Sequence, residues 1–226
     1  MIQQLSWDTR FFGYPVGLTQ ISAPDQLQGF EAAAPEYKLV YIFADQPLSK
    51  LPEQVIPVDV KVVWSLPLAK GAAQAVAPDF PIIRYKGKAS PALMELALES
   101  GVCSRFRLDP RLTHGEFKKI YSQWLQNALL KGQVFVAKDG ADIMGMITME
   151  YQNGKAKIGL VAVAEPYRGR GIAKALVQKC AEVAADAGCT HLFNPTQAHN
   201  QPAMRCYSGL GFLETERKYV YHYWRG

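Results

Sequence analysis

The sequence has few cysteines and no long apolar run, and each shortage excludes a class of protein. It contains only four cysteines in 226 residues, and their spacing matches neither a metal site nor a redox pair. No apolar stretch approaches the length of a membrane-spanning helix. Residues 1–8 lack the basic and apolar regions of a signal peptide. We therefore expect a cytoplasmic protein without a structural metal and without a membrane anchor.

Strong charge is also lacking. The net charge is +5, and the sequence contains no long run of lysine or arginine. This mild basic excess suits an anionic small ligand and is too weak to indicate a nucleic-acid partner. Apolar residues make up 49% of the chain, enough for a sizeable core in one large or two small domains.

The first 85 residues differ in character from the rest. They are rich in proline and carry short β-like runs, of which Leu39–Phe43 and Val58–Leu66 are the clearest. Small residues, prolines and a glycine between 69 and 81 predict a linker or an exposed loop. We therefore expect a smaller N-terminal α/β domain over residues 1–85 and a second domain over residues 86–226.

Two helices are predicted at the start of the second part. The first covers about 90–100, with Ser90 as N-cap and Pro91 at the first helical position. The second covers Thr113–Leu130, where apolar residues recur at helical spacing and Thr113 and Glu116 fit a capping box.

The remaining elements follow from hydrophobic periodicity and from Asp-Gly and Asn-Gly turns. They are strands over Val134–Lys138, Ile143–Tyr151, Lys157–Val163 and His191–Thr196, helices over Gly171–Ala187 and Pro202–Ser208, and a strand pair over Phe212–Trp224.

The segment Tyr167–Ala173 is basic and rich in glycine, and it joins an apolar strand to an amphipathic helix. Glycines let the backbone approach a ligand closely, and a helix N-terminus offers free N–H groups and partial positive charge. The side chains of Arg170 and Lys174 can add positive charge. These features predict a phosphate-binding turn.

Two motifs resemble a known family. The spacing Arg168-x-x-Gly171-x-Ala173 is neither the dinucleotide nor the P-loop pattern. It resembles the pyrophosphate-binding signature of the GNAT N-acetyltransferases. The motif that runs from Asn200 through Tyr207 to Phe212 resembles the C-terminal signature of the same family, and the order of elements from residue 90 matches its fold.

This resemblance implies a fold of the α/β (α+β) class and a nucleotide co-substrate. The expected GNAT fold has a mixed, mostly antiparallel sheet flanked by helices, here with the smaller N-terminal domain attached. The implied co-substrate is acetyl-CoA, and no metal is implied. The expected cofactor contacts are Leu160, Val161, Val163, Arg168, Gly169, Arg170, Gly171, Ile172, Ala173 and Asn200.

Tyr207 is the expected catalytic acid, because its phenol can protonate the CoA thiolate as the thiolate leaves. Asn200 is expected to bond the CoA arm or the start of the helix. The general base is open between Glu150, His199 and a chain of water molecules. A thiol-acyl route through Cys206 is disfavoured because no base partner is evident.

Two further stretches, over residues 5–16 and 103–128, resemble the bacterial dTDP-fucosamine acetyltransferases. This implies acetylation of the amino group of a nucleotide-linked deoxysugar, by direct attack in a ternary complex, for cell-surface polysaccharide. Guanidinium groups suit diphosphate oxygens. The expected acceptor contacts are Ser104, Arg105, Phe106 and Arg107, and Trp7, Phe11, Phe12 and Tyr14 are expected to pack between the two domains.

Two other functions remain open. The same chemistry could act on a protein N-terminus, a peptide or a small amine. Alternatively, the chain could be a non-catalytic sensor that binds acyl-CoA. The sequence is compatible with a homodimer and gives no direct sign of one.

Overall fold

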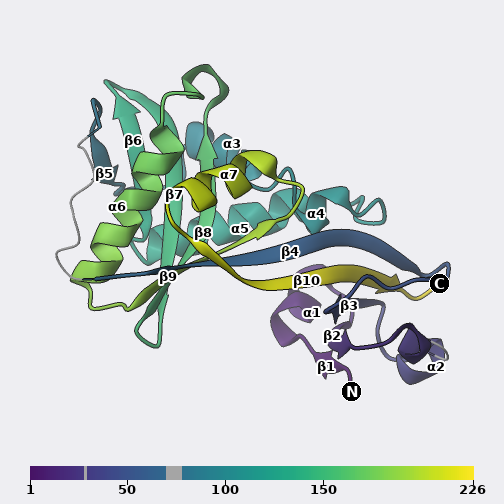
Figure 1. Cartoon of the computed structure of the whole chain (residues 1–226). Helices are drawn as coiled ribbons and strands as arrows, with labels where there is room; N and C mark the ends of the chain where they lie inside the picture. Colours follow the sequence, from purple (N-terminus) through teal and green to yellow (C-terminus); the bar gives the residue numbers. More distant parts are fainter. Residues whose placement is uncertain (28–29, 70–77) are drawn as a thin grey trace.

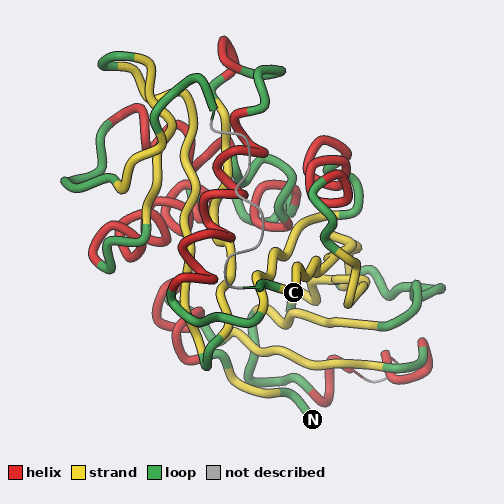
Figure 2. The backbone as a smooth tube through the Cα atoms, turned by 60° about the vertical axis from the view of Figure 1, so that its left-hand side comes forward, coloured by secondary structure: helices red, strands yellow, loops and turns green. Residues whose placement is uncertain are grey.

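The computed structural model describes residues 1–27, 30–69 and 78–226, and its centre is a ten-stranded mixed sheet with helices on both faces (Figures 1 and 2). The strands are β1 (Gln3–Gln4), β2 (Val16–Ile21), β3 (Leu39–Ala44), β4 (Val55–Pro67), β5 (Ile82–Arg84), β6 (Val134–Asp139), β7 (Asp142–Gln152), β8 (Lys155–Val163), β9 (His191–Gln197) and β10 (Leu213–Trp224). The helices are α1 (Ser6–Phe12), α2 (Phe30–Ala33), α3 (Pro91–Glu99), α4 (Arg105–Leu108), α5 (Glu116–Leu130), α6 (Ile172–Asp186) and α7 (Gln201–Gly209), with short 3₁₀ turns η1 (Pro24–Leu27) and η2 (Glu165–Tyr167).

The sheet is continuous through both halves of the chain. Its order is β1-β2-β3-β10-β4-β9-β8-β7-β6-β5, and only the pairs β2/β3 and β8/β9 are parallel. The last strand, β10, lies between β3 and β4, and β4 also pairs with β9. Figure 1 shows these two long strands, β4 and β10, reaching from the middle of the molecule into the N-terminal part. Residue 85 is therefore not a break in the sheet, although most strands before it gather at one end.

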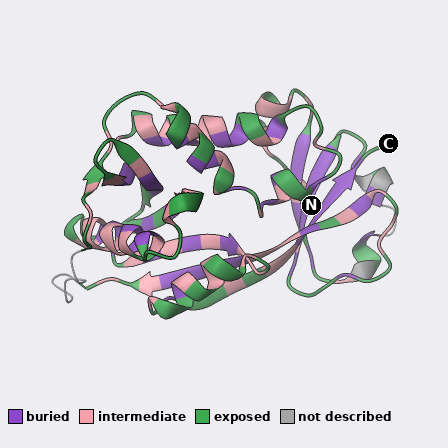
Figure 3. Ribbon diagram, turned by 90° about the horizontal axis from the view of Figure 1, so that it is seen from above, coloured by how far each residue is buried: buried purple, intermediate pink, exposed green. Residues whose placement is uncertain are grey.

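Helices cover the two faces of the sheet with separate cores. On one face α6 packs with Tyr207 and Phe212 against the strands. On the other face α3, α4 and α5 share a core with residues of β3 and with Trp224 of β10. Figure 3 shows buried positions concentrated in the strands and on the inner sides of these helices. The predicted apolar face of α6 is confirmed at Ile172, Leu176 and Cys180.

The aromatic residues near the N-terminus link the two halves, as expected. The ring of Trp7 stacks on Phe11, with centroids 4.9 Å apart. Phe12 lies 6.4 Å from Phe106 of α4, and Tyr14 lies 6.1 Å from Trp224 of β10. These contacts hold α1 and the following loop against the helices of the second half.

Several local predictions are confirmed. The Ser90 side chain accepts a hydrogen bond from Leu93 N at the start of α3, with Pro91 in the first turn. The Asn-Gly turn between β7 and β8 carries Asn153 at a φ of 51°. The predicted linker at 69–81 lies mostly outside the described residues.

Two local predictions are wrong. The helix α5 begins at Glu116 after Gly115 rather than at Thr113, and the Glu116 carboxylate accepts from His114 N instead of completing a capping box. The C-terminal tail is one twelve-residue strand, β10, and not a strand pair. Residues 105–108, which include three of the expected acceptor contacts, form a short helix.

No helix in the described ranges is long and apolar enough to cross a membrane.

A buried polar network fixes the loop after α4 to the end of β10. The carboxylate of Asp109 accepts from His222 Nδ1 at 2.5 Å, from Trp224 Nε1 at 2.9 Å and from Arg111 N at 2.8 Å. Burial alone would raise the pKa of Asp109, but these hydrogen bonds hold it below its ordinary value. His222 is completely buried, and its Nε2 has no hydrogen-bond partner in the described chain, so a proton there would be a buried donor without an acceptor. We therefore take His222 as neutral.

Replacing His222 should flatten the acid side of the stability curve. Burial lowers the pKa of His222 to about 4, from 6.5 in an unfolded chain. As the pH falls from 6.5 to about 4, the unfolded state binds a proton that the folded state refuses, and the free energy of unfolding falls by up to roughly 1.4 kcal/mol per pH unit. His222→Asn keeps an N–H for Asp109 and does not titrate, so its curve should lose this slope. Urea unfolding at several pH values measures both curves, and parallel curves would show that His222 is not the group responsible.

Candidate active site

The cleft lies where β8 and β9 separate. These parallel strands pair at three positions, from Lys155↔His191 to Lys157↔Phe193, and no pair follows in the described register. A cavity of about 910 Å³ opens beyond that point. It is lined by β8, by the turn before α6, by β9 and α7, and on the far side by β4 and the segment from α3 to α4.

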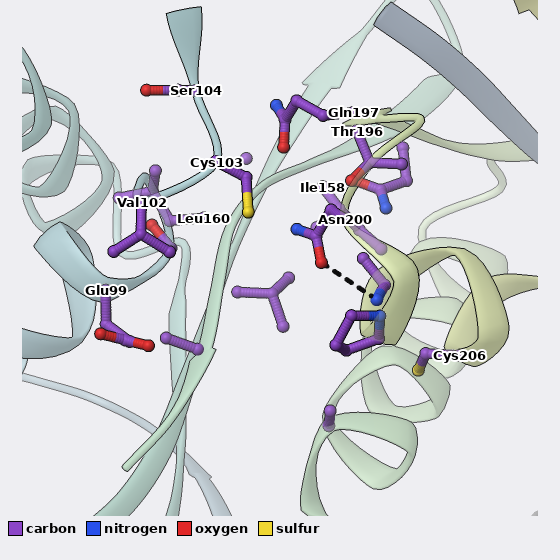
Figure 4. Close-up of a pocket in the computed structure, with 18 of the residues that line it drawn as sticks. Glu99, Val102, Cys103, Ser104, Ile158, Leu160, Thr196, Gln197, Asn200 and Cys206 are labelled. Atoms are coloured by element: carbon purple, nitrogen blue, oxygen red, sulfur yellow. Dashed lines mark hydrogen bonds between the residues drawn. The ribbon is translucent and has the colours of Figure 1, made fainter. Parts of the chain in front are cut away.

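Figure 4 shows the two walls of this cleft. Glu99, Val102 and Cys103 lie on one side, and Asn200 and Cys206 lie on the other. The walls come from segments far apart in the sequence, so the cavity exists only in the folded chain. A cleft with two distinct walls can hold two ligands side by side.

A bulge in β8 shapes the inner wall. The register with β7 shifts between Ile147↔Val161 and Met149↔Ile158, so Thr148 faces the extra residue of β8. The amide of Leu160 donates to Thr148 Oγ1 at 2.8 Å. Gly159 is needed here, because a Cβ atom on it would lie 2.6 Å from the same hydroxyl oxygen.

Val161 and Val163 turn backbone groups toward the cleft. The amide of Ala164 donates to Met144 O, so along this antiparallel ladder Ala162 and Ala164 bond to β7 and the residues between them face the other way. The Val163 carbonyl accepts from Arg168 Nε at 3.2 Å on that open side. Of the three expected backbone contacts, Val161 and the N–H of Val163 are therefore open to a ligand, while the Val163 carbonyl and the Leu160 N–H are already bonded.

The glycine-rich turn lies at the mouth of the cavity. Gly171 is the N-cap of α6 with a φ of 74°, and Gly169 has a φ of 79°. The first amide bonded within the helix is Ala175 N, which donates to Gly171 O at 3.0 Å, so the amides of residues 172–174 have no partner within the helix. The cavity is lined at this end by Arg168, Gly169, Gly171, Ile172, Ala173 and Lys174.

The two arginines of the turn behave differently. Arg168 forms an ion pair with Glu99 of α3 at 2.6 Å, in addition to its bond with Val163 O, and so links the turn to both walls. The guanidinium of Arg170 lies over the ring of Tyr167 at 5.7 Å and is not among the residues that line the cavity.

Tyr207 lies on the cavity wall and is buried. Its ring packs edge-on against Phe212 at 5.5 Å. Burial raises the pKa of its phenol well above the ordinary value, and the neighbouring Asn194 side chain offsets part of the rise. A phenol in this position holds its proton at neutral pH and can donate it.

Asn200 caps α7 with its side chain. Its Oδ1 accepts from Ala203 N at 3.2 Å, as Figure 4 shows by a dashed line. Asn200 also lines the cavity, so its amide nitrogen remains available on the same side as Tyr207.

The four residues expected to bind the acceptor do not act alike. Ser104 and Phe106 are buried in the wall, and Phe106 belongs to the core under α4. The Arg105 guanidinium lies 4.4 Å from the centroid of the Tyr41 ring and 4.7 Å from that of Phe106, at the edge of the cavity. Arg107 is exposed, lies over Phe117 and is not among the lining residues.

Both side chains expected as a general base reach the cavity. Glu150 of β7 and His199, just before α7, line it and are exposed to solvent. Two further polar residues in the wall were not expected from the sequence. Asn194 of β9 is buried, and Asp59 of β4 has a buried oxygen. Asn194 could have been found from its place in the strand: side chains there alternate between buried and partly exposed, and Asn194 is a polar residue at a buried position.

Comparisons with known proteins agree with this geometry. The model of the family described as "Acetyltransferase (GNAT) family" matches residues 93–212, more than half of the chain. A GCN5-related N-acetyltransferase from Sphaerobacter thermophilus has a similar fold, with a TM-score of 0.56 at 22% identity over 86% of this chain and 63% of that one.

Two curated relatives differ in how much they share. The spore coat polysaccharide biosynthesis protein SpsD of Bacillus subtilis is 30% identical over 138 residues, 60% of this chain and 47% of that protein. Several other relatives are also matched over less than half of their own length. The dTDP-fucosamine acetyltransferase of Escherichia coli is 26% identical over 221 residues, 93% of this chain and 92% of that protein. With the family model matched across its second half, the chain belongs to the GNAT acetyltransferase family.

Proposed function

We propose that this protein transfers the acetyl group of acetyl-CoA to the amino group of a nucleotide-linked amino deoxysugar. The observation that supports this choice of acceptor is the match to the dTDP-fucosamine acetyltransferase, because the match covers both the N-terminal strands and the cleft. Relatives named N-alpha-acetyltransferases match only about a third of the chain. The polysaccharide biosynthesis protein SpsD supports the same direction.

The residues at the cleft fit acetyl-CoA. Unpaired amides at the start of α6, with Gly169 and Gly171 in left-handed conformations, suit a pyrophosphate. Val161 and Val163 offer backbone groups to the amide-bearing arm of the molecule. The thioester supplies an activated acetyl group when bound.

The chain's own residues then carry the remaining roles. Tyr207 donates a proton to the departing thiolate sulfur, and the Asn194 side chain steadies its hydroxyl. The wall formed by β4 and α4 holds the amine opposite, so attack occurs directly within a ternary complex. No covalent acyl-enzyme is required, and burial raises the pKa of the Cys206 thiol, which disfavours a thiolate nucleophile.

A thiol-release assay tests this proposal. The protein is incubated with acetyl-CoA and, separately, dTDP-fucosamine, the same amino sugar without its nucleotide, a peptide with a free N-terminus, and spermidine. We expect the highest kcat/KM with dTDP-fucosamine. A higher kcat/KM with the peptide or with spermidine would show that this amine, and not the nucleotide sugar, is the acceptor. Calorimetric binding of acetyl-CoA without turnover on any amine would indicate a sensor.

A further inference from the structure

A carboxylate with one buried, unpaired oxygen lies in the acceptor wall of the cleft. Asp59 belongs to β4, at a point where the register with β10 slips between Val220↔Asp59 and Tyr221↔Pro57. The next residue, Val60, accepts a hydrogen bond through its carbonyl from Ala198 N. Asp59 therefore lies beside the segment that leads from β9 into α7, and it lines the same cavity as Tyr207.

The Oδ1 atom of Asp59 is buried and has no hydrogen-bond partner among the described residues. Lys61, two residues along the same strand, is committed to Glu216 at 2.8 Å. The guanidinium of Arg105 is stacked on Tyr41 and Phe106. A buried carboxylate oxygen without a donor is costly unless a ligand supplies one.

The charged and titratable groups around Asp59 do not cancel this cost. Burial raises the pKa of Asp59 to about 7 and outweighs Arg105 of α4, a backbone hydrogen bond from Val60, and Lys61 of β4, all of which lower it. Cys103, before α4, and Tyr121 of α5 are the other titratable neighbours, and Asp59 raises the pKa of each. His199 lines the same cavity from the β9 side. Asp59 can therefore gain and lose a proton near neutral pH.

We propose that Asp59 binds the ammonium group of the acceptor and takes its proton. An ammonium group offers the charged N–H donor that the unpaired oxygen lacks. Glu150 and His199 also line the cavity, but both are exposed to solvent, so water can satisfy their polar atoms. The inference rests on the proposed acetyl transfer and identifies the group that prepares the nucleophile.

The proton and electron balance is complete. Asp59 accepts one proton from R–NH₃⁺, and the nitrogen lone pair forms a C–N bond with the thioester carbonyl carbon. The C–S bond breaks, and Tyr207 gives its proton to the thiolate. A second proton leaves the nitrogen as the amide forms and restores the Tyr207 phenol through water. Asp59 finally releases its proton to solvent, leaving an amide and CoA thiol.

The test is the pH dependence of Asp59→Asn. With the fastest amine of the panel, we expect kcat/KM at pH 7 to fall about 10²–10³-fold. The loss should shrink as the pH rises toward the pKa of the amine, because solvent then supplies the neutral nucleophile. Binding of acetyl-CoA by calorimetry should equal that of the wild type. Asp45→Asn is the matched control, because Asp45 is exposed, pairs with Lys218 and lies outside the cavity.

Two results would overturn the inference while leaving acetyl transfer intact. One is an unchanged kcat/KM in Asp59→Asn, and the other is a loss of equal size at every pH. A second measurement does not need turnover: a side-chain carboxyl ¹³C resonance that is absent from Asp59→Asn should titrate with a midpoint near 7. A midpoint below 5 excludes Asp59 as the base even if no amine of the panel is acetylated, whereas failure of the whole panel by itself overturns only the proposed function.

Discussion

Replacing Tyr207 with phenylalanine is expected to slow acetyl transfer about 10²–10⁴-fold, the range that a positioned proton donor contributes. The ring should keep its packing against Phe212, so the change removes the hydroxyl and little else. The KM for acetyl-CoA should stay close to that of the wild type. Because burial raises the pKa of this phenol, it remains protonated on the alkaline side, and the wild type should not lose kcat there through Tyr207.

Single-turnover and steady-state thiol release measure this effect. Tyr85→Phe is the matched control, because its hydroxyl donates to Lys88 O at the surface and does not line the cavity. If Tyr207→Phe retains more than a tenth of the activity while the control is normal, another group protonates the thiolate.

Placing an aspartate at Gly171 is expected to weaken acetyl-CoA binding about 100-fold. Two unit charges 5 Å apart repel by roughly 3 kcal/mol at an effective dielectric constant of 20. Gly171 has a φ of 74°, and a Cβ atom there would meet nothing within 4 Å. Asparagine and aspartate both tolerate this conformation better than other residues.

Gly171→Asn is therefore the control for the charge alone. Any side chain at this left-handed φ is strained, so both variants should lose some free energy of unfolding, and their comparison isolates the charge. Calorimetry gives the dissociation constant of each variant for acetyl-CoA in low and in high salt. The difference between the two dissociation constants should be smaller in high salt. Equal dissociation constants for the two variants would show that the pyrophosphate does not bind at this turn.

The sequence indicates the cofactor side of the cleft well, because that side depends on local features. A left-handed glycine, a helix start and a capping asparagine each occupy a few consecutive residues, as at Gly171 and Asn200. Their physical roles follow from residue type and spacing, without knowledge of the rest of the chain.

The acceptor side could not be predicted in the same way. Arg105 and Arg107 are alike in the sequence, but they are two residues apart on a helix, about 200° around its axis, so one lies toward Tyr41 and the other over Phe117. Asp59 lies between two valines, a pattern that by itself predicts a strand residue facing solvent. Its position in the cavity wall depends on the slip near Pro57 and on strands more than a hundred residues later.

The hydrogen bond of the Leu160 amide could not be predicted either, because its partner is also distant in the sequence. Its acceptor is Thr148, twelve residues earlier on the neighbouring strand, and the pairing depends on a register shift. A bulge of this kind changes which backbone groups face outward without any change in hydrophobic pattern.

The position of β10 has a consequence for how the protein reaches its folded state during synthesis. β3 and β4 leave the ribosome early, yet the strand that lies between them follows every other described strand. Until residues 213–224 are available, both strands have an open edge of the kind that invites pairing with other chains. The wall that carries Asp59 is thus completed only once residues 213–224 have been made, and removal of β10 would disrupt this wall even though the glycine-rich turn lies far earlier in the sequence.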